Sequence, residues 1–181
     1  MTTGAFSPEY ARGKTWKVDE GLWNAVLATI PRGSSVLDIG AGIGRYVSLL
    51  NQNGYKASGV DGIKDIEQIS KGVVKHYDLT GGYAETVDAA EWGMFIEVGE
   101  HIPELYSQRV IENVAALAKN SVICSWATIG QRGQSHINCR TAEWVVWAFT
   151  KYTDFTFNEY STVLARKVAG KGWDRKLLVF S

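Results

Sequence analysis

The sequence has few cysteines, no long apolar run and no apolar leader. Its two cysteines, Cys124 and Cys139, lie outside any CxxC pair, which argues against a disulfide framework and against a cysteine-based metal site. The longest apolar run, WVVWAF, is far shorter than the ~20 residues of a membrane helix. The start of the chain lacks a basic stretch followed by an apolar one, the pattern of a secretory signal. These absences predict a soluble, cytoplasmic protein with no membrane partner.

The sequence also lacks an excess of charge, because 19 basic residues balance 19 acidic ones. Non-specific nucleic-acid binding depends on an excess of positive charge, so nucleic acid is not the expected partner, although the sequence does not exclude it. Basic residues cluster only near the C-terminus, between Arg166 and Lys176. We interpret that cluster as the solvated end of a hairpin. The sequence gives no indication of the oligomeric state.

Apolar segments of strand and helix type alternate along the 181 residues. This alternation predicts one α/β domain, residues 1–181, with a doubly wound and mostly parallel sheet that carries helices on both faces. The expected strands are residues 35–40, 56–62, 73–80, 92–99 and 121–127, with two C-terminal β segments at 156–166 and 173–181. The expected helices are residues 16–30, 45–54, 64–72, 103–120 and 140–152. In such sheets ligands bind beyond the carboxyl ends of the strands.

Three glycines at alternate positions follow the first expected strand, in the sequence VLDIGAGIGRY. Together with Asp38 they form the pattern D-x-G-x-G-x-G, in which Gly40, Gly42 and Gly44 bring a bare backbone to the sheet edge. Glycine permits positive φ angles and lets a ligand approach the main chain. A tight strand-to-helix turn without a ligand would use the same residues, so the glycines alone leave both interpretations open.

Two further acidic residues favour the interpretation of the glycine loop as a ligand-binding site. Asp61 ends the second strand, roughly 20 residues after the first glycine, where a carboxylate accepts hydrogen bonds from ribose hydroxyls. Asp78 ends the third strand. The third glycine comes one residue too early for the nicotinamide fingerprint, and Asp38 would be a poor neighbour for a pyrophosphate. A cationic nucleoside, S-adenosylmethionine, fits these acids better.

The ordered motifs over residues 36–126 resemble the class I S-adenosylmethionine-dependent methyltransferases. The resemblance implies a seven-stranded sheet of order 3-2-1-4-5-7-6, with an antiparallel strand supplied by the C-terminal β pair. It also implies a cap segment and helix at 1–30, a cofactor-binding core at 34–126 and an acceptor part at 127–181. Within that core, the glycine loop would contact the methionine moiety. The cofactor-binding residues that we expect are Asp38, Gly40, Ala41, Gly42, Gly44, Asp61, Gly62, Ile63, Asp78, Leu79, Glu97 and Tyr10.

A second group of polar residues follows the fourth strand in IEVGEHIP, where Glu97, Glu100 and His101 lie within five positions. His136 follows the fifth strand, in the neighbouring loop. Glu97, Glu100, His101 and His136 form a mixed oxygen and nitrogen set suited to Mg²⁺, Mn²⁺ or Zn²⁺. The pattern resembles the metal-dependent branch of the superfamily, the small-RNA 3′-terminal 2′-O-methyltransferases and the ubiquinone-pathway O-methyltransferases, where a metal binds the accepting hydroxyls.

Two other interpretations of this group stay open. Glu100 and His101 could cap the next helix while Glu97 touches the cofactor. Without a metal, His101 or His136 could act as a general base, because histidine titrates near neutral pH. We therefore regard His101, His136 and Glu100 as the candidate catalytic residues.

The segment after the fifth strand, SWATIGQRGQSHIN, resembles the GQGG-x-x-H-x-N loop of a group of small methyltransferases, with Arg132 in place of a small residue. Methyltransferases of this fold place acceptor-binding residues there. In many of them an N-terminal segment covers the cofactor, and Tyr10 would then lie over its methionine end. An aromatic contact outside the sheet is an equal alternative for Tyr10.

The expected function is therefore methyl transfer to a small-molecule acceptor, with oxygen as the favoured accepting atom. One alternative is an RNA 2′-O-methyltransferase with a divalent metal. The other is a protein that binds or degrades S-adenosylmethionine without transferring its methyl group.

Overall fold

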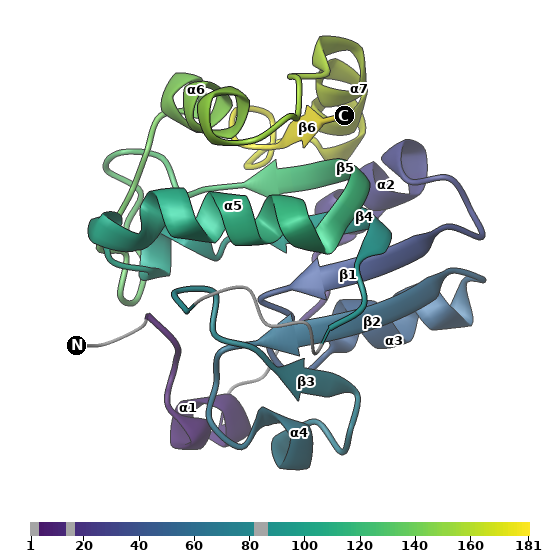
Figure 1. The fold of residues 1–181 in the computed structure, drawn as a ribbon. Helices are drawn as coiled ribbons and strands as arrows, with labels where there is room; N and C mark the ends of the chain where they lie inside the picture. The colour runs from purple at the N-terminus through teal and green to yellow at the C-terminus, as the bar shows by residue number, and fades with distance from the viewer. Residues whose placement is uncertain (1–3, 14–16, 82–86) are drawn as a thin grey trace.

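The computed structural model describes residues 4–13, 17–81 and 87–181, and in these residues six strands form one sheet of order β3-β2-β1-β4-β5-β6 (Figure 1). The first five strands are parallel, and β6 pairs with β5 in the antiparallel direction. The strands are β1 (Ser35–Ile39), β2 (Lys56–Asp61), β3 (Val74–His76), β4 (Ala90–Ile96), β5 (Ala118–Ser125) and β6 (Leu178–Phe180). The predicted α/β class with a mostly parallel sheet is thus confirmed.

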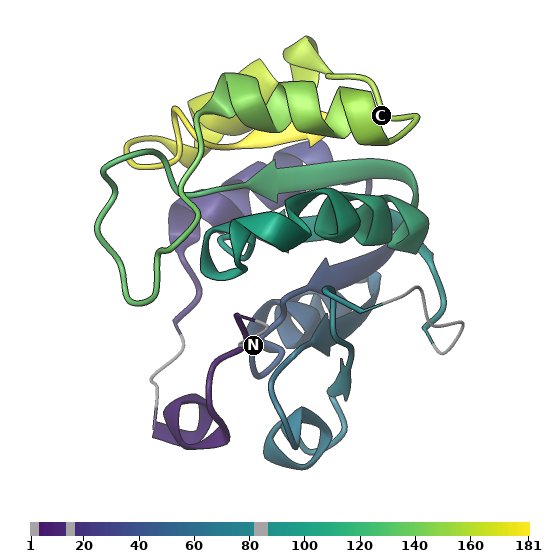
Figure 2. The same cartoon turned by 60° about the vertical axis from the view of Figure 1, so that its left-hand side comes forward.

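Helices cover both faces of the sheet (Figures 1 and 2). The longer helices are α2 (Glu20–Thr29), α3 (Arg45–Gln52), α5 (Ser107–Leu117), α6 (Ala142–Tyr152) and α7 (Glu159–Ala169). The short ones are α1 (Pro8–Gly13), α4 (Ile66–Ile69) and the 3-10 turns η1 (Gly99–His101) and η2 (Glu104–Tyr106). Helices α5 and α6 share one apolar core with the sheet, whereas α2, α3 and α7 share the core on the opposite face.

The local sequence explains where these elements begin and end. Asp19 caps α2 by accepting the amide of Leu22, and Thr141 caps α6 in the same way. The predicted helix 103–120 is shorter than expected, because Ala118 already pairs with Ala90 as the first residue of β5. The first turn of this predicted helix, which was expected to begin at Pro103, forms the separate 3-10 turn η2.

The predicted β segment at 156–166 is wrong, and with it the count of seven strands. Residues from Glu159 onward form α7, which packs its small buried residues against α2. Asn158 caps this helix by accepting the amide of Ser161. Of this segment, Phe157 alone forms a β-bridge, an isolated antiparallel one with Phe180, at the edge where the sixth strand of the predicted order was expected. The second predicted segment, 173–181, shortens to β6.

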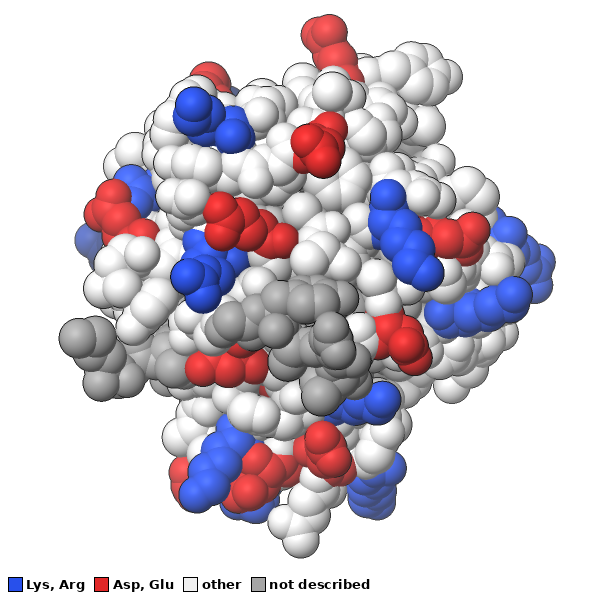
Figure 3. Space-filling view, viewed as in Figure 1, with Lys and Arg blue, Asp and Glu red and all other residues white. Residues whose placement is uncertain are grey.

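None of the helices in the described part of the chain is long and apolar enough to cross a membrane. Acidic and basic side chains are interspersed on the face drawn in Figure 3, which agrees with the balanced charge of the sequence.

Candidate active site

A cavity of about 200 Å³ lies at the carboxyl edge of the sheet, beside the ends of β1, β2 and β4. Its wall contains many of the residues predicted from the sequence, namely Gly40, Gly42, Asp61, Gly62, Asp78, Leu79, Glu97 and His101. The other predicted residues lie outside this wall, namely Asp38, Ala41, Gly44, Ile63, Tyr10, Glu100 and His136. The topology therefore brings the glycine loop, the strand-end acids and one histidine to a single cavity.

The glycine loop has a backbone that side chains would disturb. Gly40 has a φ of 87°, and a Cβ there would collide with the side chain of Val98, which lies against the loop. The amide of Gly42 donates a hydrogen bond of 2.8 Å to Oδ2 of Asp61. The bare backbone therefore serves the turn itself, and it also forms part of the cavity wall.

The carboxylate of Asp61 is held by two amides, since Ile63 donates to Oδ1 at 2.9 Å while Gly42 donates to Oδ2. Burial raises the pKa of Asp61, and these amide hydrogen bonds act in the opposite direction. A carboxylate offers about four lone-pair sites, so the Asp61 carboxylate keeps capacity to accept from a ligand. Two adjacent acceptors of this kind suit the paired hydroxyls of a ribose.

Asp38 lies below the cavity wall rather than in it, with 5% of its surface exposed. Burial, with a further contribution from the charge of Asp61, raises the pKa of Asp38 to about 7. This residue is therefore partly protonated at neutral pH.

The loop after β3 is fixed by a residue that the sequence analysis did not single out. Asn113, buried on α5, donates its side-chain amide to the carbonyl oxygens of Leu79 at 2.8 Å and Gly81 at 3.1 Å. Asp78 accepts both the amide and the hydroxyl of Thr80. A polar residue on the apolar side of a helix was the only signal in the sequence for Asn113.

The N-terminal segment lies along the cavity, because Gly4, Ala5 and Phe6 form part of its wall. Phe6 contacts the imidazole of His101 edge-on, with 4.9 Å between ring centroids, and stacks on Tyr10 at 4.6 Å. A Cβ at Gly4 would come within 2.5 Å of the carbonyl oxygen of His101. Phe6, rather than the predicted Tyr10, is thus the aromatic residue of this segment that borders the cavity.

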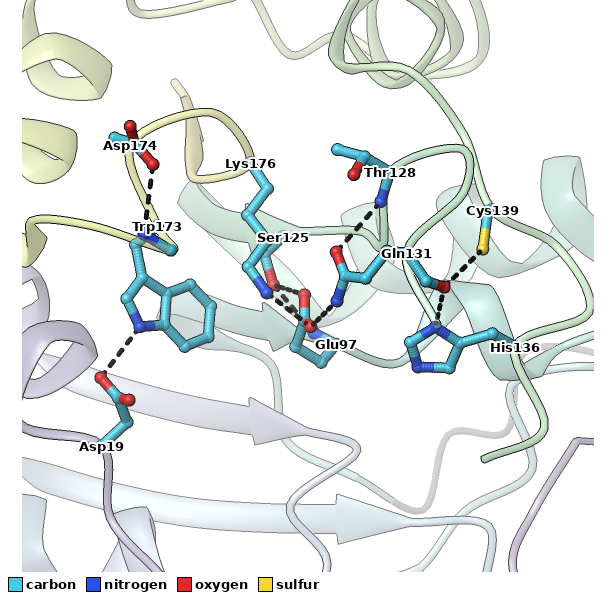
Figure 4. Close-up of polar contacts among 11 residues, drawn as sticks. Asp19, Glu97, Ser125, Thr128, Gln131, His136, Cys139, Trp173, Asp174 and Lys176 are labelled. Carbon is cyan, nitrogen blue, oxygen red and sulfur yellow. Dashed lines mark hydrogen bonds and ion pairs between the residues drawn. The ribbon is translucent and has the colours of Figure 1, made fainter. Parts of the chain in front are cut away.

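Glu97 follows β4 with a left-handed backbone, φ 54°, a conformation that non-glycine residues seldom adopt. Its Oε1 accepts the hydroxyl of Ser125 at 2.9 Å, and its Oε2 accepts Gln131 at 3.2 Å and the ammonium of Lys176 at 2.7 Å (Figure 4). Lys176 also lies over the ring of Trp173, 4.3 Å from its centroid.

These contacts correct the interpretation of the C-terminal basic cluster. Lys176 is not at the solvated end of a hairpin, because only 13% of its side chain is exposed and it pairs with a cavity residue. This ion pair could not be predicted from the sequence, because Glu97 and Lys176 are 79 positions apart and belong to no common motif.

Glu100, His101 and His136 form a compact group in which one ligand atom from each residue lies within 4.8 Å of the others. Both histidines place Nδ1 near a backbone carbonyl oxygen, that of Ser135 at 3.3 Å for His101 and that of Gln131 at 3.1 Å for His136. A carbonyl oxygen can only accept, so the tautomer that makes these hydrogen bonds carries its proton on Nδ1 and its lone pair on Nε2.

Glu100 is fully buried, and neither of its carboxylate oxygens makes a hydrogen bond of ordinary geometry with the described residues, although the amides of Glu100 and Ala127 act to lower its pKa. Burial and the neighbouring charge of Glu97 raise the pKa of Glu100 to about 8. Burial also lowers the pKa of His101 and favours its neutral form. A buried carboxyl with no partner requires either a proton or a cation, and it lies beside two imidazole nitrogens. Glu97, the fourth predicted metal ligand, lies outside this group.

The loop between β5 and α6 is anchored to the backbone of Glu100. The carbonyl oxygen of Glu100 accepts the amides of Ile137 and Asn138, and the indole of Trp126 donates to the carbonyl oxygen of Asn138. A Cβ at Gly133 would collide with the imidazole of His136. These contacts hold His136 against His101, with 5.1 Å between their ring centroids.

No protein-family model matches the sequence, and no curated protein matches it. Solved structures do share its fold. A protein of Pyrococcus horikoshii superimposes with a TM-score of 0.69 at 16% identity, over 90% of this chain and 88% of that one. A TehB-like SAM-dependent methyltransferase of Corynebacterium glutamicum gives a TM-score of 0.65 at 16% identity, over 89% and 86% of the two chains.

Magnesium protoporphyrin IX methyltransferase of Synechocystis, solved with bound SAM, gives a TM-score of 0.63 at 13% identity, over 95% of this chain and 88% of that one. At such low identity these structures show the fold, and it is one that S-adenosylmethionine-dependent methyltransferases use. The fold implied by the resemblance to the class I methyltransferases is thereby confirmed, except that the described residues form six strands rather than seven.

Proposed function

We propose that this protein is an S-adenosylmethionine-dependent methyltransferase that acts on a small-molecule acceptor, with oxygen as the favoured accepting atom. The observation that carries the proposal is the charge of the cavity wall. The wall contains Asp61, Asp78 and Glu97 and, among the described residues, no lysine or arginine. A sulfonium ligand suits such a wall, whereas a pyrophosphate does not.

The residues divide the proposed cofactor site into three parts. The paired acceptors of Asp61 would bind the ribose hydroxyls, and the loop at Asp78 and Leu79 would border the adenine. The glycine loop and Glu97 would surround the methionine end. In this arrangement the methyl group points toward His101, which lies in the same wall.

The acceptor would bind between the glycine loop and the histidines. Methyl transfer is a direct displacement, and much of its catalysis comes from holding the nucleophile and the methyl carbon about 3 Å apart and in line. Nε2 of His101 and of His136 has the free lone pair that a general base needs. Phe6 and the loop at 127–140 would shield this space from water.

The group of Glu100, His101 and His136 also suits a divalent metal, and we propose that it binds Mg²⁺, Mn²⁺ or Zn²⁺. Glu100 offers its carboxylate oxygens, and His101 and His136 each offer one ring nitrogen. A bound ion would lower the pKa of an acceptor hydroxyl. Glu97 would join only after exchanging its contact with Lys176, so three protein ligands are the expected set.

Two alternatives have some support. An RNA 2′-O-methyltransferase would use the same E-x-x-E-H group, but the interspersed charges of Figure 3 offer no continuous basic surface on that face. A protein that binds or degrades the cofactor would use the same acidic wall. Product analysis separates these, because methyl transfer needs an acceptor and yields S-adenosylhomocysteine, whereas degradation consumes the cofactor alone.

Calorimetric titration with S-adenosylmethionine and S-adenosylhomocysteine tests the proposal, with EDTA and with added Mn²⁺. Asp61→Ala removes the acceptors for the ribose and should weaken binding on the order of 100-fold, as expected for two hydrogen bonds to a charged group. Asp154→Ala, a change at an exposed carboxylate, is the matched control and should bind as the wild type does. An absence of binding to either ligand under all conditions would refute the proposed function.

A further inference from the structure

The acidic wall of the cavity creates a problem for the proposed cofactor. The methionine end of S-adenosylmethionine carries a carboxylate as well as an ammonium group. Asp61, Asp78 and Glu97 all repel a carboxylate, and no lysine or arginine of the described residues lies in the wall to attract it. A cation from outside the wall must therefore compensate this charge.

Lys176 is such a cation. It approaches from the loop between α7 and β6, and its Nζ lies 2.7 Å from Oε2 of the wall residue Glu97 (Figure 4). The position is built rather than incidental. Trp173 holds the ammonium over its ring at 4.3 Å, and its indole is fixed by a 2.9 Å hydrogen bond to Asp19.

The pair is mostly shielded from water, since 13% of the Lys176 side chain and 27% of the Glu97 side chain are exposed. Removing two charges from water costs free energy that their attraction repays only in part, so such a pair adds little to stability. A function that needs both charges in one place accounts for the arrangement better than folding does.

Both groups keep capacity for a ligand. Lys176 has three N–H donors and uses one at Glu97. The carboxylate of Glu97 offers about four lone-pair sites, of which Ser125, Gln131 and Lys176 occupy three. A zwitterion placed beside the pair can therefore donate a hydrogen bond from its ammonium group to Glu97 and accept one from Lys176 with its carboxylate. Each charge of the zwitterion then lies next to an opposite charge of the protein.

We propose that Lys176 and Glu97 together recognise the amino-acid end of the cofactor, Lys176 through the carboxylate and Glu97 through the ammonium group. This inference rests on the proposed function. It assigns the C-terminal loop to the cofactor site, in which Trp173 is a positioning residue.

Three nucleosides test the proposal in equilibrium titrations. S-adenosylhomocysteine has both charges, its decarboxylated analogue keeps only the amine, and 5′-methylthioadenosine has neither. Lys176→Met should weaken the binding of S-adenosylhomocysteine roughly 10- to 100-fold, the loss expected for one hydrogen bond between charged groups. The same variant should bind methylthioadenosine as the wild type does, and it should not bind the decarboxylated analogue more weakly.

Lys171→Met, an exposed change in the same loop, is the matched control, and Lys176→Arg should keep the preference for the carboxylate. Thermal unfolding of each variant checks that the fold is intact. The inference is overturned if Lys176→Met binds S-adenosylhomocysteine unchanged or more tightly, or if it weakens all three nucleosides equally. If the wild type binds none of the three, the proposed function fails and this inference with it, an outcome distinct from the preceding ones.

Discussion

The buried carboxyl of Asp38 makes the stability of the protein depend on pH in a predictable direction. Its pKa is about 7 in the fold, because burial and the charge of Asp61 penalise ionisation, against an ordinary value of 3.8. Below pH 3.8 the folded and unfolded chains are both protonated at this site, so its contribution is fully present. As the pH rises to about 7 the unfolded chain loses this proton while the folded one keeps it, and stability falls.

The size of the loss follows from the difference between the two pKa values. Each pKa unit corresponds to 1.36 kcal/mol, so Asp38 costs the folded state about 4 kcal/mol once the pH exceeds 7. Because only 5% of the residue is exposed, solvent screening removes little of this cost. Asp38→Asn keeps the shape and removes the titration. The stability of this variant relative to the wild type should therefore grow by about 4 kcal/mol between pH 3.5 and pH 8.

Urea unfolding of the two proteins at a series of pH values measures this difference. Subtracting the wild-type curve from that of Asp38→Asn cancels the contribution of the other buried acids to first order. Asp154→Asn, at an exposed position, should give a curve parallel to the wild type. If the Asp38→Asn curve is also parallel, within about 1 kcal/mol, Asp38 is ionised in the fold and the reasoning from its burial is wrong.

Two changes test the loops that border the cavity. Gly133→Ala should displace the imidazole of His136 and lower both activity and Mn²⁺ affinity, while the free energy of unfolding changes by less than about 1 kcal/mol because the loop is exposed there. Asn113→Ala should lower the free energy of unfolding by about 1–3 kcal/mol, since the carbonyls of Leu79 and Gly81 lose their donor, and calorimetry should show weaker nucleoside binding. A Gly133→Ala protein with unchanged Mn²⁺ affinity, or an Asn113→Ala protein with unchanged stability, would contradict these assignments.

The part of the cavity formed by the glycine loop and the strand-end acids was predictable because its placement depends on short-range rules. Parallel strands end at one edge of the sheet, so an acid at the end of each strand must lie at that edge. Asp61 and Asp78 occupy such ends, and both lie in the cavity wall. The glycine conformations follow from the local sequence, as the φ of 87° at Gly40 shows. None of these positions requires knowledge of how distant loops pack.

The C-terminal prediction failed because local propensity and tertiary packing disagree there. The stretch from Thr156 to Arg166 is rich in β-branched and aromatic residues, which favours a strand on composition. The structure instead forms a helix that buries the small side chains of Ala165 and Ala169 in the same core as α2. The helix signals were present in the sequence, since Asn158 is a good cap and Gly170 a good terminator.

The group of Glu100, His101 and His136 was harder to predict because its geometry depends on contacts between remote segments, and the backbone of Glu100 explains how the fold makes them. The carbonyl oxygen of Glu100 accepts the amides of Ile137 and Asn138, which brings the loop after β5 to the end of β4. The residue that fixes this loop is therefore the one whose side chain stands beside both histidines. These bonds use no side-chain atom of Glu100, so Glu100→Gln should leave them in place and separate the proposed chemical role of the residue from its structural one, whereas changes in the loop that disturb the backbone should alter both together.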